Sequence, residues 1–196
     1  DVALLKNLRI LGLPPSITEK GFANLSALEN LELITLHRGQ GEGLKHLARN
    51  QNMKQIAFGD ITDDDMRHIG LFKKIEKVDL AKHDNLSAAG IKHLQNLENL
   101  QYLDLRSILI GDEGLSHLAG LVKLRVLFLS DSSDNEITDD GMKYVAKMKS
   151  LENLELVLVQ LTDKGIRHLT TLPKLKHLTL QFCLHPISNK NIISFK

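Results

Sequence analysis

The sequence has few cysteines that could form disulfide bonds, few aromatic residues that could stack against bases, and no long apolar run. A single cysteine, Cys183, excludes an internal disulfide bond, tryptophan is absent, and aromatic residues make up 4% of the chain. No apolar run approaches the roughly 18 residues of a transmembrane helix, so we expect no membrane span. Lys and Arg number 25 against 24 Asp and Glu, and this net charge of +1 argues against a protein built mainly to hold nucleic acid.

The beginning of the chain shows no targeting signal. It starts at Asp1 without an initiator methionine, and no charged segment followed by an apolar one is visible. A signal peptide that has been removed would leave the same sequence, so the compartment stays open, with the cytoplasm slightly favoured.

Leucine is the most abundant residue and occupies 38 of the 196 positions. The segment Leu97–Leu105 has the form LxxLxxLxL, which returns at Leu121–Leu129, Met148–Leu156 and Leu172–Leu180, and four weaker copies precede them. We place the closing apolar residues of the eight copies at Leu13, Leu33, Phe58, Leu80, Leu105, Leu129, Leu156 and Leu180. Their spacing averages about 24 residues, a period typical of stacked repeat proteins.

A second motif follows most copies and predicts a helix start. It reads Ile-Thr-Asp-Asp-Gly at residues 137–141 and has close relatives at 17–21, 61–65 and 161–165. The threonine stands where an N-cap hydroxyl accepts a bond from free backbone N–H groups, and the acids after it suit the positive end of the helix dipole. Each unit therefore combines a strand, a turn and a helix of at most two turns, and stacking buries the leucine faces.

The chain resembles leucine-rich-repeat proteins of the ribonuclease-inhibitor-like kind, in the ITDxGLxxLxxLxxLxxLxL variant of bacterial arrays, over nearly all of residues 4–193. The resemblance implies an α/β solenoid of about eight repeats, shaped as a horseshoe arc with a parallel sheet on the concave face and short helices on the convex face. Residues 1–196 then form one domain, truncated or uncapped at the N-terminus, with a degenerate repeat over 182–196. The polar residue that often bonds the turn after each strand in this family is mostly missing, so we expect irregular turn hydrogen bonding.

Three local features indicate structure rather than chemistry. The glycines of residues 37–43 lack the spacing of a phosphate-binding loop, and the acidic segment 130–136 lacks the glycine and glutamate of an EF-hand. Neighbouring helices lie about 10 Å apart, too far for shared zinc, so we expect the recurring histidines to bond the last helix carbonyls. These histidines are His46, His68, His93, His117 and His168. With HExxH, GxSxG and CxxC also absent, we predict no enzyme, no catalytic residue, no cofactor and no metal.

Alternation along each strand places three residues per repeat on the concave face. Because parallel strands lie about 4.8 Å apart, the apolar residues of repeats five to seven fall together. They are Tyr102, Val126, Phe128 and Val157, bordered by the charged residues Asp79, Asp104, Arg106 and Glu155, and Glu32 of repeat two is assigned to the same central column as these acids. An apolar centre with aromatic residues inside a charged rim is typical of protein-binding surfaces.

These patterns favour a non-catalytic recognition module that binds a protein or peptide in its concave face, with a partner that is basic at the contact. One alternative is a GTPase-activating or other regulatory or enzymatic role on the same fold, for which Arg38 and Arg106 are the arginine candidates. Another is the substrate-receptor part of a ubiquitin-ligase-like assembly. The open N-terminal edge also predicts self-association.

Overall fold

The fold is described from a computed structural model over residues 2–130 and 137–182. Residues 131–136 of the predicted acidic turn and all of the predicted degenerate repeat except Phe182 lie outside these described residues. Within the two described ranges, no helix is long and apolar enough to cross a bilayer.

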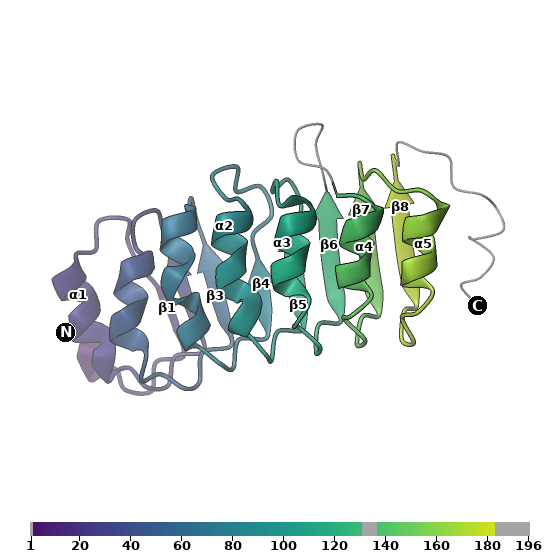
Figure 1. The fold of residues 1–196 in the computed structure, drawn as a ribbon. Coiled ribbons are helices and arrows are strands. Elements are labelled where there is room, and N and C mark those ends of the chain that lie inside the picture. The colour runs from purple at the N-terminus through teal and green to yellow at the C-terminus, as the bar shows by residue number, and fades with distance from the viewer. Residues whose placement is uncertain (1, 131–136, 183–196) are drawn as a thin grey trace.

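Eight strands pair in one parallel sheet, in the order in which they occur along the chain (Figure 1). They are β1 (Ile10–Gly12), β2 (Leu33–Leu36), β3 (Gln55–Phe58), β4 (Lys77–Asp79), β5 (Tyr102–Leu105), β6 (Val126–Ser130), β7 (Asn153–Val157) and β8 (His177–Gln181). Each repeat thus contributes one strand, and the next repeat adds its strand alongside. The predicted α/β repeat architecture is confirmed.

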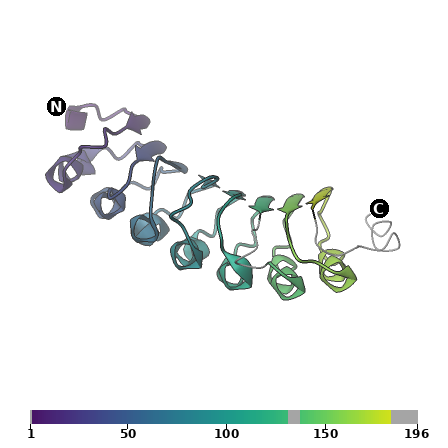
Figure 2. The same cartoon turned by 90° about the horizontal axis from the view of Figure 1, so that it is seen from above.

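The segments that return to the next strand are short helices, several of them of the tighter 3-10 kind. They are η1 (Val2–Leu4), α1 (Glu19–Asn24), η2 (Leu25–Ala27), η3 (Gly41–Leu47), η4 (Asp63–Leu71), α2 (Ala88–Ile91), η5 (Lys92–Asn96), α3 (Gly111–Leu118), α4 (Asp139–Val145) and α5 (Asp163–Leu169). Figure 2 shows the solenoid from above: the helices form the outer row of an arc and the strands form the inner row. The sheet therefore lies on the concave side.

Within the described residues, the predicted helix caps are present. The side-chain oxygen of Thr162 accepts a bond from the backbone N–H of Lys164 at 3.1 Å, and Thr138 and Ser87 cap α4 and α2 in the same way. Thr62 forms a capping box with Asp65 at the start of η4. These bonds satisfy N–H groups that a two-turn helix would otherwise leave free at its start.

Leucine, isoleucine and methionine side chains fill the space between the sheet and the helices. In β5, Leu103 and Leu105 point into this layer and are fully buried, and the residues at the same positions of β6 and β7 repeat the arrangement. Burying one such side chain contributes about 1.5–3 kcal/mol. One core runs through the stack, because each repeat buries its apolar face against its neighbours.

The predicted register of repeat two is wrong by three residues. The sheet pairs Ile10 with Leu33 and Gly12 with Thr35, so Ile34 and Leu36 are the buried strand residues. Two frames satisfy the leucine pattern here, since it fits from Leu25 as well as from Leu28. The observed frame closes at Leu36 and makes the spacing of the repeats more even.

Aspartates in the first turn of several helices bond the next repeat, in place of the missing polar ladder. The carboxylate of Asp139 accepts from the backbone N–H of Thr162 at 2.9 Å, from its hydroxyl at 2.6 Å and from Gly165 N–H at 2.8 Å. Asp63 and Asp112 bond Ser87 and Thr138 in the same way. Burial raises the pKa of Asp139, but the bonds from Thr162 and Gly165 outweigh it and leave that pKa below its ordinary value.

The glycine of the helix-start motif makes room for this aspartate. A Cβ atom on Gly165 would overlap the carboxylate of Asp139, and a Cβ on Gly141 would overlap that of Asp112. Neither glycine has a positive φ angle, so the close approach of the carboxylate is what requires glycine here. The motif thus encodes contacts between neighbouring repeats as well as a helix start.

The turns that lead from each helical segment into the next strand all lie along one edge of the sheet (Figure 1). We call this the strand-start edge. It comprises residues 5–9, 28–32, 48–54, 72–76, 97–101, 119–125, 146–152 and 170–176.

Candidate protein-binding surface

The concave face presents alternate residues of the eight strands in three columns. The observed register places Asp104 of β5 beside Phe128 of β6, and Phe128 beside Glu155 of β7. Tyr102 pairs with Val126, and Ser130 pairs with Val157. The predicted residues of repeats five to seven therefore do come together on neighbouring strands.

Two aromatic side chains form the centre of this group. The rings of Tyr102 and Phe128 meet edge to face, with their centroids 5.7 Å apart and their planes at 89°. Both side chains are half-buried, as is that of Val126, which pairs with Tyr102 and lies two residues before Phe128 on β6. Such a pair contributes about 0.5–1.5 kcal/mol beyond its buried area, so the two rings hold each other in place.

A cation lies over each aromatic ring. Lys77 Nζ is 4.7 Å from the centroid of Tyr102, and Arg106 Cζ is 5.0 Å from the centroid of Phe128. Lys77 was not among the predicted site residues, although it occupies the column of Tyr102 on the adjacent strand. We call Lys77, Tyr102, Arg106 and Phe128 the aromatic–cation cluster.

Asp104 anchors the cluster from below and is not the exposed rim residue that the sequence predicted. Its side chain is 1% exposed. Arg106 donates to it from Nε at 3.0 Å and from Nη2 at 2.6 Å, and the backbone N–H of Arg106 adds a bond of 3.1 Å. These hydrogen bonds raise the pKa of Arg106, and burial, followed by the charge of Asp104, raises the pKa of Tyr102. Asp104 therefore serves the fold by fixing the guanidinium over Phe128.

Three further predicted residues surround the cluster. Glu155 lies beside Phe128 with one carboxylate oxygen 3.8 Å from Arg106 Nη1. Asp79 is exposed at the end of β4, where its carboxylate accepts a bond from the backbone N–H of Ala81. Val157 is half-buried two residues beyond Glu155 on β7, which places it diagonal to Phe128. Asp79 and Glu155 are thus the acids that this region leaves at its surface.

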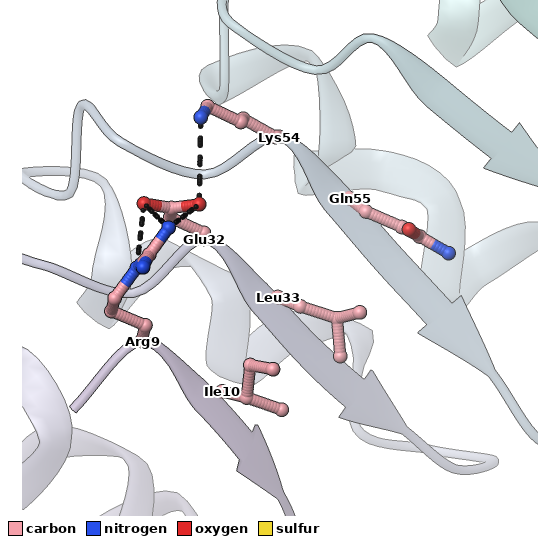
Figure 3. Close-up of a pocket in the computed structure, with 6 residues that line it drawn as sticks. All are labelled: Arg9, Ile10, Glu32, Leu33, Lys54 and Gln55. Atoms are coloured by element: carbon pink, nitrogen blue, oxygen red, sulfur yellow. Dashed lines mark hydrogen bonds and ion pairs between the residues drawn. The ribbon is translucent and has the colours of Figure 1, made fainter.

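Glu32 does not belong to the central column, because the register of repeat two differs from the prediction. It lies just before β2 on the strand-start edge, where Arg9 donates to both of its oxygens at 2.9 Å and Lys54 to one at 3.4 Å (Figure 3). The bonds from Arg9 are the main reason that its pKa falls below the usual range. Thr35 takes the predicted place of Glu32 in the column.

The same arrangement returns five repeats later and was also missed by the sequence analysis. Glu152, just before β7, accepts from Arg125 at 2.8 Å and from Lys176 at 2.8 Å. These two bonds lower the pKa of Glu152 to about 2. The signal in the sequence is the charge that alternates in sign at the residue before seven of the eight strands, with the uncharged Gln101 before β5. These residues are Arg9, Glu32, Lys54, Glu76, Arg125, Glu152 and Lys176.

Solved structures of other proteins share this arrangement of strands and helices. Internalin C2 of Listeria monocytogenes is similar with a TM-score of 0.65 and 22% sequence identity, over 93% of this chain and 71% of the internalin. The internalin InlF of the same organism has a TM-score of 0.65 and 21% identity, over 99% of this chain and 60% of the internalin. The fold is a leucine-rich-repeat solenoid. At these identities the likeness concerns the fold alone.

A plant protein extends the comparison. The peptide hormone receptor RGFR1, solved in complex with RGF2, has a TM-score of 0.55 and 15% identity, over 92% of this chain and 29% of the receptor. The solenoid therefore spans less than a third of that receptor's length. No protein-family profile and no curated protein sequence matches the chain.

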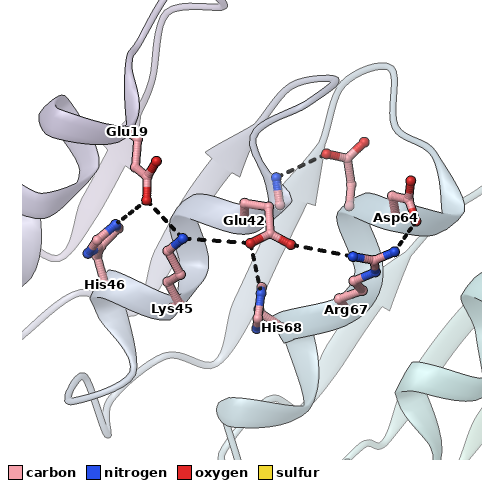
Figure 4. Close-up of polar contacts among 9 residues, drawn as sticks. Glu19, Glu42, Lys45, His46, Asp64, Arg67 and His68 are labelled. Carbon is pink, nitrogen blue, oxygen red and sulfur yellow. Dashed lines mark hydrogen bonds and ion pairs between the residues drawn. The ribbon is translucent and has the colours of Figure 1, made fainter.

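The convex face of the solenoid carries a network of charges between neighbouring helices (Figure 4). The imidazole Nε2 atoms of His46 and His68 lie 3.5 and 3.3 Å from carboxylate oxygens of Glu19 and Glu42. The predicted bonds from these two histidines to helix carbonyls are wrong, because the rings face acids of the preceding repeat. Among residues 2–130 and 137–182, no group of three or more His, Cys, Asp and Glu side chains is arranged to hold a metal ion.

Both arginines that the sequence offered for an enzymatic alternative have acidic partners. Arg38, two residues after β2, lies 3.5 Å from Asp60, two residues after β3, and Arg106 is held by Asp104. Neither guanidinium is presented as an unpaired group on the solenoid. The geometry therefore gives no support to an arginine that acts on a bound nucleotide.

Proposed function

We propose that the solenoid is a non-catalytic recognition module that binds a protein or peptide through its concave face. The aromatic–cation cluster is the observation that supports this proposal. Its rings are fixed by each other, and Arg106 is fixed by the buried Asp104, so binding a partner would order few further side chains. Aromatic and arginine side chains held in this way are the residues that contribute most to protein interfaces.

The partner that fits this surface offers an apolar side chain with a basic group beside it. The apolar group would cover Tyr102, Val126 and Phe128, and the basic group would approach Asp79 or Glu155. Since Arg106 neutralises Asp104 and Glu32 lies outside the columns, the attraction for a basic partner comes from these two acids. The assignment to the ribonuclease-inhibitor-like subtype and self-association through the open side of β1 stay predictions.

Peptide display against the intact chain tests the proposal. Peptides selected on the native protein would be measured by titration against Phe128→Ala and Tyr102→Ala. We expect each variant to lose about 30-fold or more in affinity, the effect of removing an interface hot spot. Tyr144→Ala is the matched control, since Tyr144 is also half-buried and lies near a lysine, but on convex helix α4.

The control decides how the result is interpreted. Circular dichroism would confirm that all three variants remain folded. Peptides that bind Phe128→Ala and Tyr102→Ala as tightly as the native protein would remove the cluster from the binding surface. An equal loss in Tyr144→Ala would point to a general loss of structure or to the convex face.

A further inference from the structure

The strand-start edge carries much more positive charge than the chain as a whole. Its turns contain twelve Lys and Arg and five Asp and Glu, a net charge of +7, whereas the whole chain has +1. All twelve basic side chains are exposed. Four of them hold Glu32 or Glu152, and the other eight make no ion pair with any residue in the described ranges. The edge is therefore a positively charged surface with little internal compensation.

The opposite edge has the opposite charge. It runs from the residue after each of β1 to β7 to the third residue of the following helix. Its described residues contain twelve Asp and Glu and five Lys and Arg, a net charge of −7. Much of this negative charge is explained by the fold, since first-turn acids stabilise helix starts and Asp63, Asp112 and Asp139 bond the next repeat.

The fold explains less of the positive charge: Lys73 and Lys149 donate to the carbonyls of Asn96 and Thr171 in the next repeat, but other lysines of the edge have no such bond within the described residues. Lys74, Lys123 and Lys174 occupy the same position of three turns, three residues before β4, β6 and β8. They lie three to five residues beyond the preceding helices, whereas the helix dipole acts within the last turn. Of the three, Lys123 has a hydrogen bond, to the side chain of Asn99. The charge of these three lysines is therefore not compensated by an acidic side chain of the described residues, and it is available to a partner outside the chain.

The shape of the edge indicates what that partner is. The turns follow one another in a row along one side in Figure 1, while the view from above in Figure 2 shows the curvature of the arc. The turns of the edge thus form one side of the solenoid, and six of the eight turns carry Lys or Arg. We propose that the strand-start edge binds a membrane surface rich in anionic lipid headgroups.

Nucleic acid fits this edge less well than a membrane does. Proteins that track single strands stack bases on exposed aromatic rings, but the one aromatic residue of these turns, Phe72, is buried. Exposed acids such as Glu29, Glu76 and Glu98 also interrupt the row and would oppose a phosphate backbone that follows it closely. A lipid surface responds to the summed charge of the whole edge, so interspersed acids reduce its attraction without blocking it.

Membrane binding through this edge would leave the concave face free. Tyr102 and Phe128 lie on the inner row of the arc, whereas the cationic turns lie along its side. The two surfaces are distinct, and the membrane proposal does not rest on the proposed function. A solenoid attached in this way would hold its acidic edge away from the lipid.

Vesicle sedimentation of the full chain tests the proposal. The protein would be mixed with vesicles of phosphatidylcholine alone and of an equimolar mixture of phosphatidylcholine and phosphatidylserine. We expect binding to the mixed vesicles only, with a steep loss as salt shortens the Debye length from about 10 Å at 0.1 M to about 3 Å at 1 M. Reversing Lys74, Lys123 and Lys174 to Glu should weaken binding by about 100-fold or more.

A matched variant separates this edge from overall charge. Reversing Lys20, Lys92 and Lys164 to Glu changes the net charge by the same amount but leaves the strand-start edge intact, because Lys20 and Lys164 lie in the opposite edge and Lys92 lies in η5. This variant should weaken binding far less. Circular dichroism would show that both variants remain folded. Equal losses in the two variants, binding that does not need phosphatidylserine, or no binding at all would overturn the proposal. So would tighter binding to duplex DNA than to vesicles, or salt-sensitive self-association without vesicle binding.

Discussion

Replacing Arg106 by Met tests whether the buried carboxylate beneath the concave face depends on its guanidinium partner. Removing one member of a buried ion pair costs about 3–5 kcal/mol, because the remaining charge loses its compensation. Asp104 is 1% exposed, but the Arg106 side chain is 45% exposed and its backbone N–H still donates to Asp104. Water can therefore reach the vacated side, and we expect the free energy of unfolding to fall by about 2–3 kcal/mol.

Urea denaturation followed by circular dichroism measures this loss. Methionine keeps an aliphatic chain over Phe128, so the change chiefly removes the charge and its hydrogen bonds. The double variant Asp104→Asn, Arg106→Met is the control, because a neutral amide is less costly to leave in this position. It should be more stable than Arg106→Met by about 1 kcal/mol. An Arg106→Met protein within about 0.5 kcal/mol of the native one, or a double variant no more stable than the single one, would refute the role of the pair.

Three further outcomes follow from contacts between the repeats. Gly165→Ala should lower the free energy of unfolding by about 1–3 kcal/mol, because the added Cβ atom would overlap Asp139. Gly120→Ala is the control and should change this free energy by less than about 0.5 kcal/mol, because its Cβ atom would meet no other atom. Equal effects of the two variants in urea denaturation would contradict this expectation. The pKa of Asp139 is lowered in the folded state, so its contribution to stability is present above about pH 4 and is lost as pH falls through the folded pKa. Asp139→Asn should therefore be less stable than the native protein at neutral pH and should lose less stability on acidification. The same loss of stability on acidification in both proteins would be the contrary result. NMR titration should give a Glu152 pKa of about 2 that rises in Arg125→Ala, and an ordinary value in the native protein would show that the ion pairs do not persist in solution.

The repeat architecture was predictable because its signal is redundant. A leucine that is misassigned in one copy is outweighed by the copies on either side, and the N-cap threonines mark each helix start independently of the leucines. Repeat two shows the limit of this reasoning. Its extra leucines fit two frames, and the even spacing of the neighbouring repeats was the available signal that favours the frame closing at Leu36.

The concave residues were predictable as positions but not as interactions. Alternation along a strand identified Tyr102, Phe128 and Arg106, because it depends on backbone geometry that every repeat shares. It did not show that Asp104 is buried, since that depends on the conformation of the Arg106 side chain. The bonds from Asp139 to the next repeat were likewise hidden, because an acid after an N-cap threonine already has a sufficient local explanation.

Amide hydrogen exchange with and without a selected peptide tests the central claim most directly. If the inner curve of the solenoid is the binding surface, the peptide should slow exchange in β4 to β7, around the aromatic–cation cluster, and leave helices α3 to α5 unchanged. Slower exchange confined to the convex helices or to the strand-start turns, with none in β4 to β7, would contradict the account.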